Sequence, residues 1–239
     1  MTSNHFAAAP DALADRLARL GRGAGVDGRQ AVLPDPLRVF HQRLLGAFLT
    51  RTGSPDARVV DDLAAELRLD SQAALAALAA ADLVHTARAT GTIVVAYPFS
   101  GRPTPYRVEL AGGPTVFAMC AVDALGIPQM LRRDGRISSV DPTSGQPITV
   151  EVHAGAWRFQ PATTVLLSGR TGDGDACDTA ADWCCPYINL HTDPEAADTY
   201  RRAHPDMTAT LLGQAEAVQA AGQAFGGLLD PPNPQETAS

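Results

Sequence analysis

Lysine is absent from this chain of 239 residues, so all 19 of its basic side chains are arginines. This absence excludes Schiff-base chemistry on a lysine amine and any phosphate-binding loop that depends on a lysine. Aromatic residues are also scarce, at 5%, although the hydrophobic content is 45%. Alanine, valine and leucine must therefore fill most of the core, in a chain long enough for one large domain or two small ones.

Long apolar runs and a positive charge balance are missing as well. No run reaches the roughly 20 residues that a bilayer-spanning helix needs. Residues 1–10 lack the basic and apolar segments of a signal peptide, so we expect a cytoplasmic protein with reduced thiols and no membrane partner. The formal net charge of −7 argues against a nucleic-acid partner.

The remaining pattern predicts an α+β fold in four parts. Residues 1–34 form an N-terminal arm, with helical spacing from Asp11 to Leu20 and a glycine-rich break after it. Residues 35–110 form a winged-helix-like module of three helices. Residues 111–229 form a mixed α/β catalytic domain with a small sheet. The proline-rich residues 230–239 form a disordered tail.

In the second part, apolar spacing predicts helices over 36–48, 59–67 and 71–81, followed by strands over 85–89, 92–98 and 107–110. Three helices followed by a small sheet are typical of a winged helix-turn-helix. DNA binding is disfavoured, because residues 71–81 hold no arginine for phosphates and only Gln72 to read bases. A reused scaffold is the preferred interpretation.

The third part alternates strands with helices. Strands are predicted over 137–140, 147–152, 163–167 and 183–190, with a polar loop over 168–182. Helices are predicted over 196–204 and 207–229. The acidic stretch from Asp173 to Asp178 lacks the glycine and glutamate of a calcium loop, so we interpret it as a solvated loop.

Cysteine and aspartate carry the most specific chemistry. Cys120 precedes Asp123 by three residues, which places both on one face of a helix. A thiol near a helix start is favoured as thiolate by the helix dipole, and the carboxyl group could hold or pass a proton. A second thiol pair follows at Cys184 and Cys185. In a strand, neighbouring side chains point to opposite faces, so only one of the pair should face Cys120.

Two other uses of these cysteines are weaker. Structural zinc usually needs paired ligands at short spacing, which adjacent cysteines do not provide. A Cys–His–Asp hydrolase would use Cys120 as nucleophile and His191 or His153 as base, but no nucleophile elbow or glycine-rich oxyanion loop is evident. A plainer alternative is that Cys177 and one of Cys184 and Cys185 are small residues without a chemical role.

Several blocks of this chain resemble the organomercurial (alkylmercury) lyases. One block runs from Phe117 to Pro128, with Arg136-Ile137-Ser138-Ser139 and Thr143-Ser144-Gly145 after it. Another is Trp183-Cys184-Cys185, followed by a helix that ends in Gln223-Ala224-Phe225-Gly226. The upstream three-helix region is also similar. The chain departs from the family pattern at Asp141, where some members carry a cysteine, and at residues 186–189, which lack a histidine-containing run.

The resemblance implies a lyase that cleaves a carbon–mercury bond by protonolysis. Cys120 and Cys184 match the two catalytic, mercury-binding thiols, and Asp123 matches the catalytic acid and a further mercury ligand. Cys185 matches a neighbouring cysteine that is not essential. No cofactor is implied. The implied partners are an organomercurial substrate, low-molecular-weight thiols and a mercuric reductase. Two alternatives stay open, namely the same scaffold repurposed for cysteine-dependent carbon chemistry in biosynthesis, and a thiol metal-binding regulator.

Overall fold

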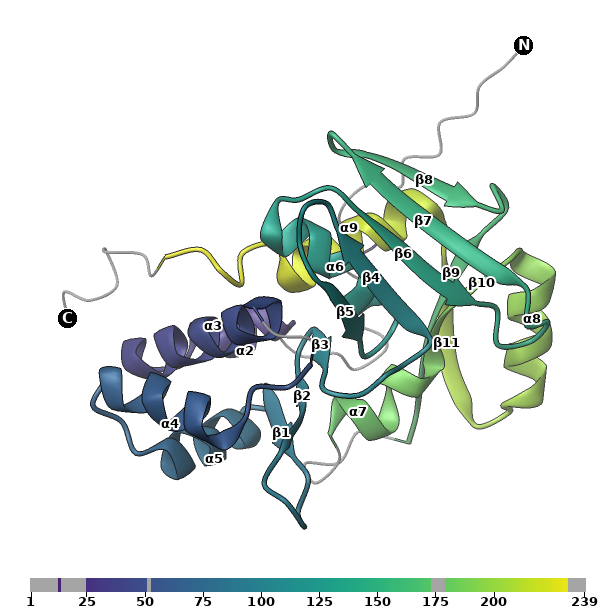
Figure 1. Ribbon diagram of the computed structural model, residues 1–239. Coiled ribbons are helices and arrows are strands. Elements are labelled where there is room, and N and C mark those ends of the chain that lie inside the picture. The colour runs from purple at the N-terminus through teal and green to yellow at the C-terminus, as the bar shows by residue number, and fades with distance from the viewer. Residues whose placement is uncertain (1–12, 14–24, 51–52, 173–178, 232–239) are drawn as a thin grey trace.

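The computed structural model describes residues 13, 25–50, 53–172 and 179–231 of the chain. Helices gather at one side of the molecule, and a large sheet with its covering helices forms the other (Figure 1). The helix expected from Asp11 to Leu20, apart from Leu13, lies outside the described residues. So do Cys177, the acidic stretch 173–178 and the expected C-terminal tail apart from residues 230–231. The polar loop expected over 168–182 is wrong at its start, because residues 168–171 belong to a strand.

The helical side consists of α2 (Val26–Ala31), α3 (Asp35–Thr50), α4 (Ala57–Glu66) and α5 (Ser71–Ala80). The three helices predicted after residue 35 are thereby confirmed. Two of them begin at aspartates, because Asp56 and Asp70 accept backbone N–H groups of Val59 at 3.0 Å and Ala73 at 2.8 Å. The apolar stripe of α3 lies in the core, as its spacing indicates.

Eight strands in the described residues form one antiparallel sheet, in the order β1-β2-β3-β5-β4-β6-β7-β8. Their bounds are β1 (Val84–Thr86), β2 (Ile93–Ala96), β3 (Phe99–Ser100), β4 (Tyr106–Leu110), β5 (Thr115–Ala118), β6 (Gly135–Val140), β7 (Pro147–His153) and β8 (Ala156–Gln160). The expected small sheet is therefore wrong in size. The short β3 and β5 escaped prediction, and their pairing of Phe99 with Ala118 continues the sheet from one part of the chain into the next.

A smaller sheet has the order β10-β9-β11, from β9 (Val165–Thr171), β10 (Ile188–His191) and β11 (Met207–Leu212). The helix predicted from Met207 is wrong over its first turns, because α9 spans only Gln214–Phe225. Met207 and Leu212 are buried as the ends of a strand. Gly213 then separates strand from helix, and its N–H donates to the Glu216 carboxylate at 2.9 Å.

The strand predicted from Trp183 to Leu190 is also wrong in its first half. The short helix α7 (Ala180–Trp183) and the 3-10 turn η1 (Cys185–Tyr187) come before β10. Pro186 has no N–H to donate to a strand partner, and it stands at the start of the turn. This turn decides the orientation of the cysteine pair, because strand alternation no longer applies to it.

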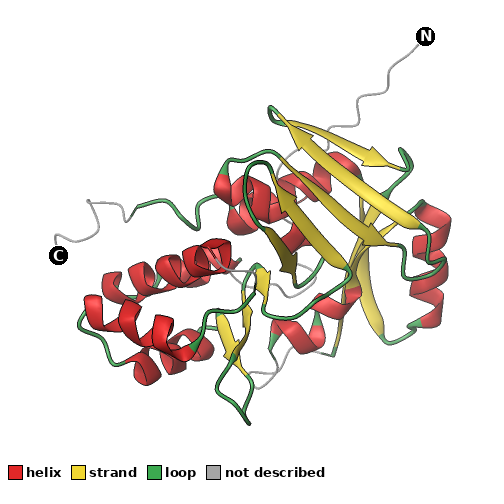
Figure 2. Ribbon diagram, in the orientation of Figure 1, coloured by secondary structure: helices red, strands yellow, loops and turns green. Residues whose placement is uncertain are grey.

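Two helices pack together against the sheets: α6 (Ala121–Leu131) and α9 (Figure 2). Gly126 allows the close approach, since a methyl group there would lie 2.3 Å from the Phe225 ring. Further out, α8 (Pro194–Ala203) covers β9, β10 and β11. No helix in the described part of the chain is long and apolar enough to cross a membrane.

Candidate active site

Cys120 stands where β5 passes into α6, as the N-cap residue of that helix. Its backbone is extended, with φ −150° and ψ −177°, and its side chain is only 2% exposed. Asp123 lies in the first turn of the same helix and is 3% exposed. The predicted helix and the shared face of these two residues are confirmed. A carboxylate in this turn is favoured by the helix dipole, which partly offsets the cost of its burial.

Cys184 and Cys185 lie between α7 and η1, and each is 6% exposed. The Cys184 thiol donates to the Ala180 carbonyl oxygen at 3.3 Å. Because the segment turns instead of running as a strand, both cysteines line the cavity that contains Cys120. The expectation that only one of them faces the site is therefore wrong, and its premise of strand geometry is the cause.

Three ligand atoms meet most closely in this site. The sulfurs of Cys120 and Cys185 and a carboxylate oxygen of Asp123 all lie within 4.8 Å of one another. All three residues are buried. Two thiols and one carboxyl group form a donor set that suits a soft metal ion better than a hard one. The family resemblance gives Cys185 no essential role, yet its sulfur is one of these three ligand atoms.

The pKa values of Cys120 and Cys185 both lie above the usual value of a thiol, so the start of α6 does not favour a thiolate here. Burial raises the pKa of Cys120, a hydrogen bond from Cys185 opposes that rise, and the Asp123 carboxylate adds to it. Hydrogen bonds to Cys120 and then to Cys184 raise the pKa of Cys185 well above its usual value, and burial adds to them. Cys185 is thus hydrogen-bonded within one buried group of thiols that includes Cys120 and Cys184.

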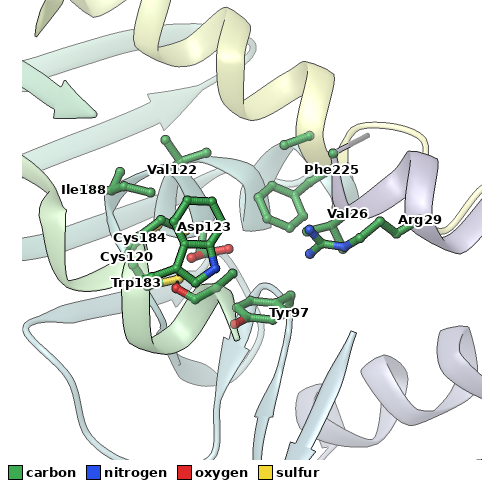
Figure 3. A pocket seen from close by; sticks show the side chains of 14 residues that line it. Val26, Arg29, Tyr97, Cys120, Val122, Asp123, Trp183, Cys184, Ile188 and Phe225 are labelled. Atoms are coloured by element: carbon green, nitrogen blue, oxygen red, sulfur yellow. Dashed lines mark hydrogen bonds between the residues drawn. The ribbon is translucent and has the colours of Figure 1, made fainter. Parts of the chain in front are cut away.

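The cavity around the thiols has a volume of about 110 Å³ (Figure 3). Its walls come from segments far apart in the sequence: α2 supplies Val26 and Arg29, the turn after β2 supplies Tyr97, and α9 supplies Phe225. Trp183 lies against the thiols and is itself stacked by the Arg170 guanidinium, 6.0 Å from its ring centre. The pocket is thus mostly apolar, with its polar groups gathered at the thiols and at Arg29.

Sequence reasoning did not identify Arg29 and Tyr97 as parts of this site. Arg29 belongs to the segment that the sequence assigns to an arm, and Tyr97 to a predicted strand end. The Arg29 guanidinium lies 5.9 Å from the centre of the Tyr97 ring. A lone arginine in an amphipathic helix and a tyrosine before a proline are ordinary features, so the sequence offered no signal that they meet.

Neither histidine proposed as a hydrolytic base lines the cavity. The His153 side chain is 90% exposed and pairs with Asp134 at 2.8 Å. His191 is fully buried, with Nδ1 3.7 Å from an Asp141 oxygen. Asp141 accepts the backbone N–H and the hydroxyl group of Thr192, both at 2.8 Å, and N–H groups of its own turn. The residue at the family's third cysteine position therefore serves to fix a turn against β10.

Residues 99–226 match a family model described as alkylmercury lyase (MerB), which is more than half of the chain. The chain belongs to the alkylmercury lyase family. Among curated relatives, the Pseudomonas putida alkylmercury lyase is 30% identical over 105 residues, which are 44% of this chain and 48% of that protein. The Streptomyces lividans alkylmercury lyase is 28% identical over 117 residues, 49% of this chain and 52% of that protein.

These matches leave much of each relative unaccounted for, since the chain spans about half the length of the curated relatives it matches. A structural comparison extends further. The crystal structure of the mercury-bound form of MerB2 superposes with a TM-score of 0.62 and 22% identity, over 82% of this chain and all of that one. At this identity the likeness establishes the fold, a mixed α/β arrangement around a large antiparallel sheet.

Proposed function

We propose that this chain is an organomercurial lyase that cleaves a carbon–mercury bond by protonolysis. The observation that carries the proposal is one buried cavity lined by Cys120, Asp123, Cys184 and Cys185 in a member of this family. Mercury is a soft cation that prefers thiolate to oxygen or imidazole. A site with thiols and a single carboxyl group fits both parts of the reaction, capture of the metal and delivery of a proton.

In this proposal Cys120 and Cys184 are the two sulfurs that hold mercury. Both line the cavity beside Asp123, and both are hydrogen-bonded to Cys185. Cys185 has a supporting role, since it donates to whichever sulfur carries negative charge. Asp123 is the acid, and it is a further ligand only while it is ionised. This assignment agrees with the resemblance of the Cys120 and Cys184 segments to the family.

The proposed reaction balances without a cofactor. The sulfur of Cys120 displaces the ligand X of R–Hg–X, and the proton of its thiol leaves with X. The sulfur of Cys184 then adds to the same mercury, and its thiol proton passes to Asp123. The electron pair of the C–Hg bond stays with carbon and takes up that proton from Asp123. The products are the hydrocarbon R–H and Hg²⁺ held by two thiolates, and mercury keeps its oxidation state.

Product removal needs a partner that also binds soft metals. Low-molecular-weight thiols or a mercuric reductase would take Hg²⁺ from the two thiolates by ligand exchange. This chemistry requires reduced cysteines, so the proposal includes a cytoplasmic location. It includes neither a nucleic acid nor a membrane as partner.

The remaining expectation concerns domain organisation. We propose that residues 35–110 are a winged-helix-like module that closes the site instead of binding DNA, next to a catalytic region over 111–229. In support, Tyr97, which follows β2 within this module, forms part of the cavity wall, and α2 just before the module supplies Val26 and Arg29. Residues 1–34 would then be more than an arm, because α2 lies within them.

The deciding experiment is hydrocarbon release from methylmercury in the presence of excess thiol, measured by gas chromatography of the headspace. We expect one methane per methylmercury consumed, and Hg²⁺ recovered in the solution. Binding of methylmercury without methane would refute the lyase proposal and favour a thiol metal-binding regulator. The matched control is the same protein with its cysteines alkylated beforehand, which should release none.

A further inference from the structure

Two buried donor groups on the wall of the cavity lack an acceptor within the described residues. They are the Arg29 Nε and the Tyr97 hydroxyl group. Tyr97 is only 1% exposed, so bulk water does not satisfy its hydroxyl group. In Figure 3 the hydroxyl end of Tyr97 is turned toward the side of the pocket that holds Cys120. Buried donors are nearly always paired in folded proteins, so the missing acceptor is expected to come from a ligand.

The existing partner of Arg29 occupies one corner of its guanidinium. The Nη2 atom donates to the Asp82 carbonyl oxygen at 3.1 Å and lies 3.6 Å from its carboxylate. The Nε atom has no hydrogen-bond partner among the described residues, and Arg29 lines the cavity. The Arg29 side chain is 29% exposed, so a molecule that enters the pocket can reach it. A guanidinium carries five N–H donors and a positive charge, so one that keeps an unpartnered N–H is a good receptor for a carboxylate oxygen.

Burial, followed by the nearby Cys185 thiol, raises the pKa of Tyr97 far above the physiological range. The hydroxyl group therefore keeps its proton and acts as a donor. Arg29 and Tyr97 also touch each other, with the guanidinium 5.9 Å from the ring centre. They form a donor-rich edge beside the thiols, and its chemistry is complementary to an anion with oxygen acceptors.

We propose that Arg29 and Tyr97 form a carboxylate-binding subsite for the substrate, which rests on the proposed lyase function. The substrate class is an organomercurial complex with mercury at one end and a carboxylate a few bonds away. The carboxylate belongs either to the organic group on mercury or to the thiol that carries it. Both residues precede the segment that matches the family model, residues 99–226, so the N-terminal region supplies this specificity.

The test measures the rate of mercury capture, which does not depend on turnover. Quenching of Trp183 fluorescence in a stopped-flow instrument reports arrival of mercury at the thiols, since this indole lines the cavity. On the thiol side, methylmercury complexed with 3-mercaptopropionate is compared with its 2-mercaptoethanol complex. On the carbon side, carboxymethylmercury is compared with ethylmercury. We expect the charged probe to be captured about threefold to tenfold faster in at least one arm, as for one ion pair and one hydrogen bond.

Variants then show which residues cause the preference for the charged probe. The quantity compared is the capture rate of the charged probe divided by that of the neutral probe. Arg29→Gln should bring the ratio close to one, Arg29→Lys should keep most of it, and Tyr97→Phe should reduce it. Arg43→Gln removes the same charge from an exposed pair with Glu66 and should leave the ratio unchanged, which controls for net charge. Tyr97→Phe removes one unpartnered hydroxyl group, so it remains informative if Arg29→Gln fails to fold.

Two results would overturn the subsite: a ratio near one in both arms of the unmodified protein, or a ratio that survives both Arg29→Gln and Tyr97→Phe. Hydrocarbon release is recorded in parallel. Its absence would refute the lyase reaction, whereas the capture ratio would still decide whether the carboxylate is recognised.

Discussion

Arg29 on α2 and Asp82 before β1 form an ion pair, with Nη2 3.6 Å from Oδ2. The same Asp82 carboxylate faces the backbone N–H of Ala180, at 3.4 Å, where the segment with the cysteine pair begins. It also contacts His85 at 2.7 Å. One carboxylate thus joins the N-terminal wall of the cavity to the wall that holds the thiols. The cavity is therefore held together by contacts between segments that are distant in sequence.

Single cysteine replacements should separate the three thiols. Cys120→Ala and Cys184→Ala should each abolish hydrocarbon release, because two thiolates are needed on one mercury. Cys185→Ala should retain turnover at a reduced rate, since it removes a donor to both sulfurs and not a ligand. Single-turnover methane release with methylmercury measures all three. Full activity in Cys184→Ala together with loss in Cys185→Ala would move the second ligand to Cys185.

Asp123→Asn should bind mercury and fail in protonolysis. An amide keeps the shape of the carboxyl group but does not deliver a proton at neutral pH. We expect stoichiometric methylmercury capture, with methane release slowed by about a hundredfold or more, within the usual range for loss of a general acid. Capture is measured by thiol titration, and release by gas chromatography. Equal release rates for the variant and the unmodified protein would remove Asp123 from the proton path.

Stability should fall in mild acid because of His41. Burial, and next the charge of Arg29, lowers the pKa of His41 from 6.5 to about 3. The folded protein therefore holds this histidine neutral, with Nδ1 2.8 Å from the Gln30 amide. Its contribution to stability is complete above pH 6.5 and is lost as the pH falls toward 3, because the unfolded chain takes up the proton first.

Thermal unfolding at several pH values measures this effect. The melting temperature should drop between pH 6.5 and pH 4, and His41→Leu should flatten that dependence while lowering stability at neutral pH. His153→Leu is the matched control, since its side chain is 90% exposed. An identical pH slope in His41→Leu would contradict the assignment.

Two glycine replacements should have opposite signs. Gly126→Ala would place a methyl group 2.3 Å from the Phe225 ring and should destabilise the protein by about 1–3 kcal/mol, as overpacking does. Gly46→Ala lies inside α3 with nothing within 4 Å of the new methyl group. It should stabilise by about 0.5–1 kcal/mol, because alanine loses less entropy in a helix. Chemical denaturation of both variants gives the two free energies of unfolding.

The helical module should not bind DNA with sequence specificity. Residues Ser71–Ala80 of α5 carry no basic side chain, and the formal net charge of the chain is −7. A reader of DNA needs several phosphate contacts, and its affinity would fall steeply with salt. Fluorescence anisotropy with the protein's own upstream DNA at low salt is the measurement. Saturable binding below micromolar concentration, displaced only by specific competitor, would favour a regulatory function.

Local features of the site follow from the sequence, and distant ones do not. Cys120 and Asp123 belong to one helix, so their spacing alone places them together. The orientation of Cys185 depends on the 3-10 turn at Pro186 and on pairing of β10 with β9, which no local pattern encodes. Arg29 reaches the cavity only through tertiary contacts.

Local sequence patterns also predict part of the fold, and pairing between distant segments determines the rest. Apolar periodicity marks α3 and α4, and aspartate caps mark α4 and α5, so the sequence predicts these helices within a few residues. The prediction of a helix at Met207–Leu212 is wrong because the alanine-rich sequence after it dominates the pattern. Its strand conformation comes from pairing with β9. The large sheet exceeds the prediction because β3, β5 and β8 were not predicted, and β3 has only two residues.

The positions of the thiols have a consequence for how the protein is made. Cys184 and Cys185 are adjacent in the chain, so a mercury ion can bridge them while the chain is still unfolded, whereas Cys120 joins them only after the distant strands have paired. A ligand that binds the unfolded chain shifts the equilibrium toward it by mass action. The toxic ion that the folded enzyme is proposed to handle is therefore also an inhibitor of its biogenesis. We expect excess free thiol to speed refolding in the presence of Hg²⁺, because it keeps the cysteine pair unoccupied until Cys120 has joined it.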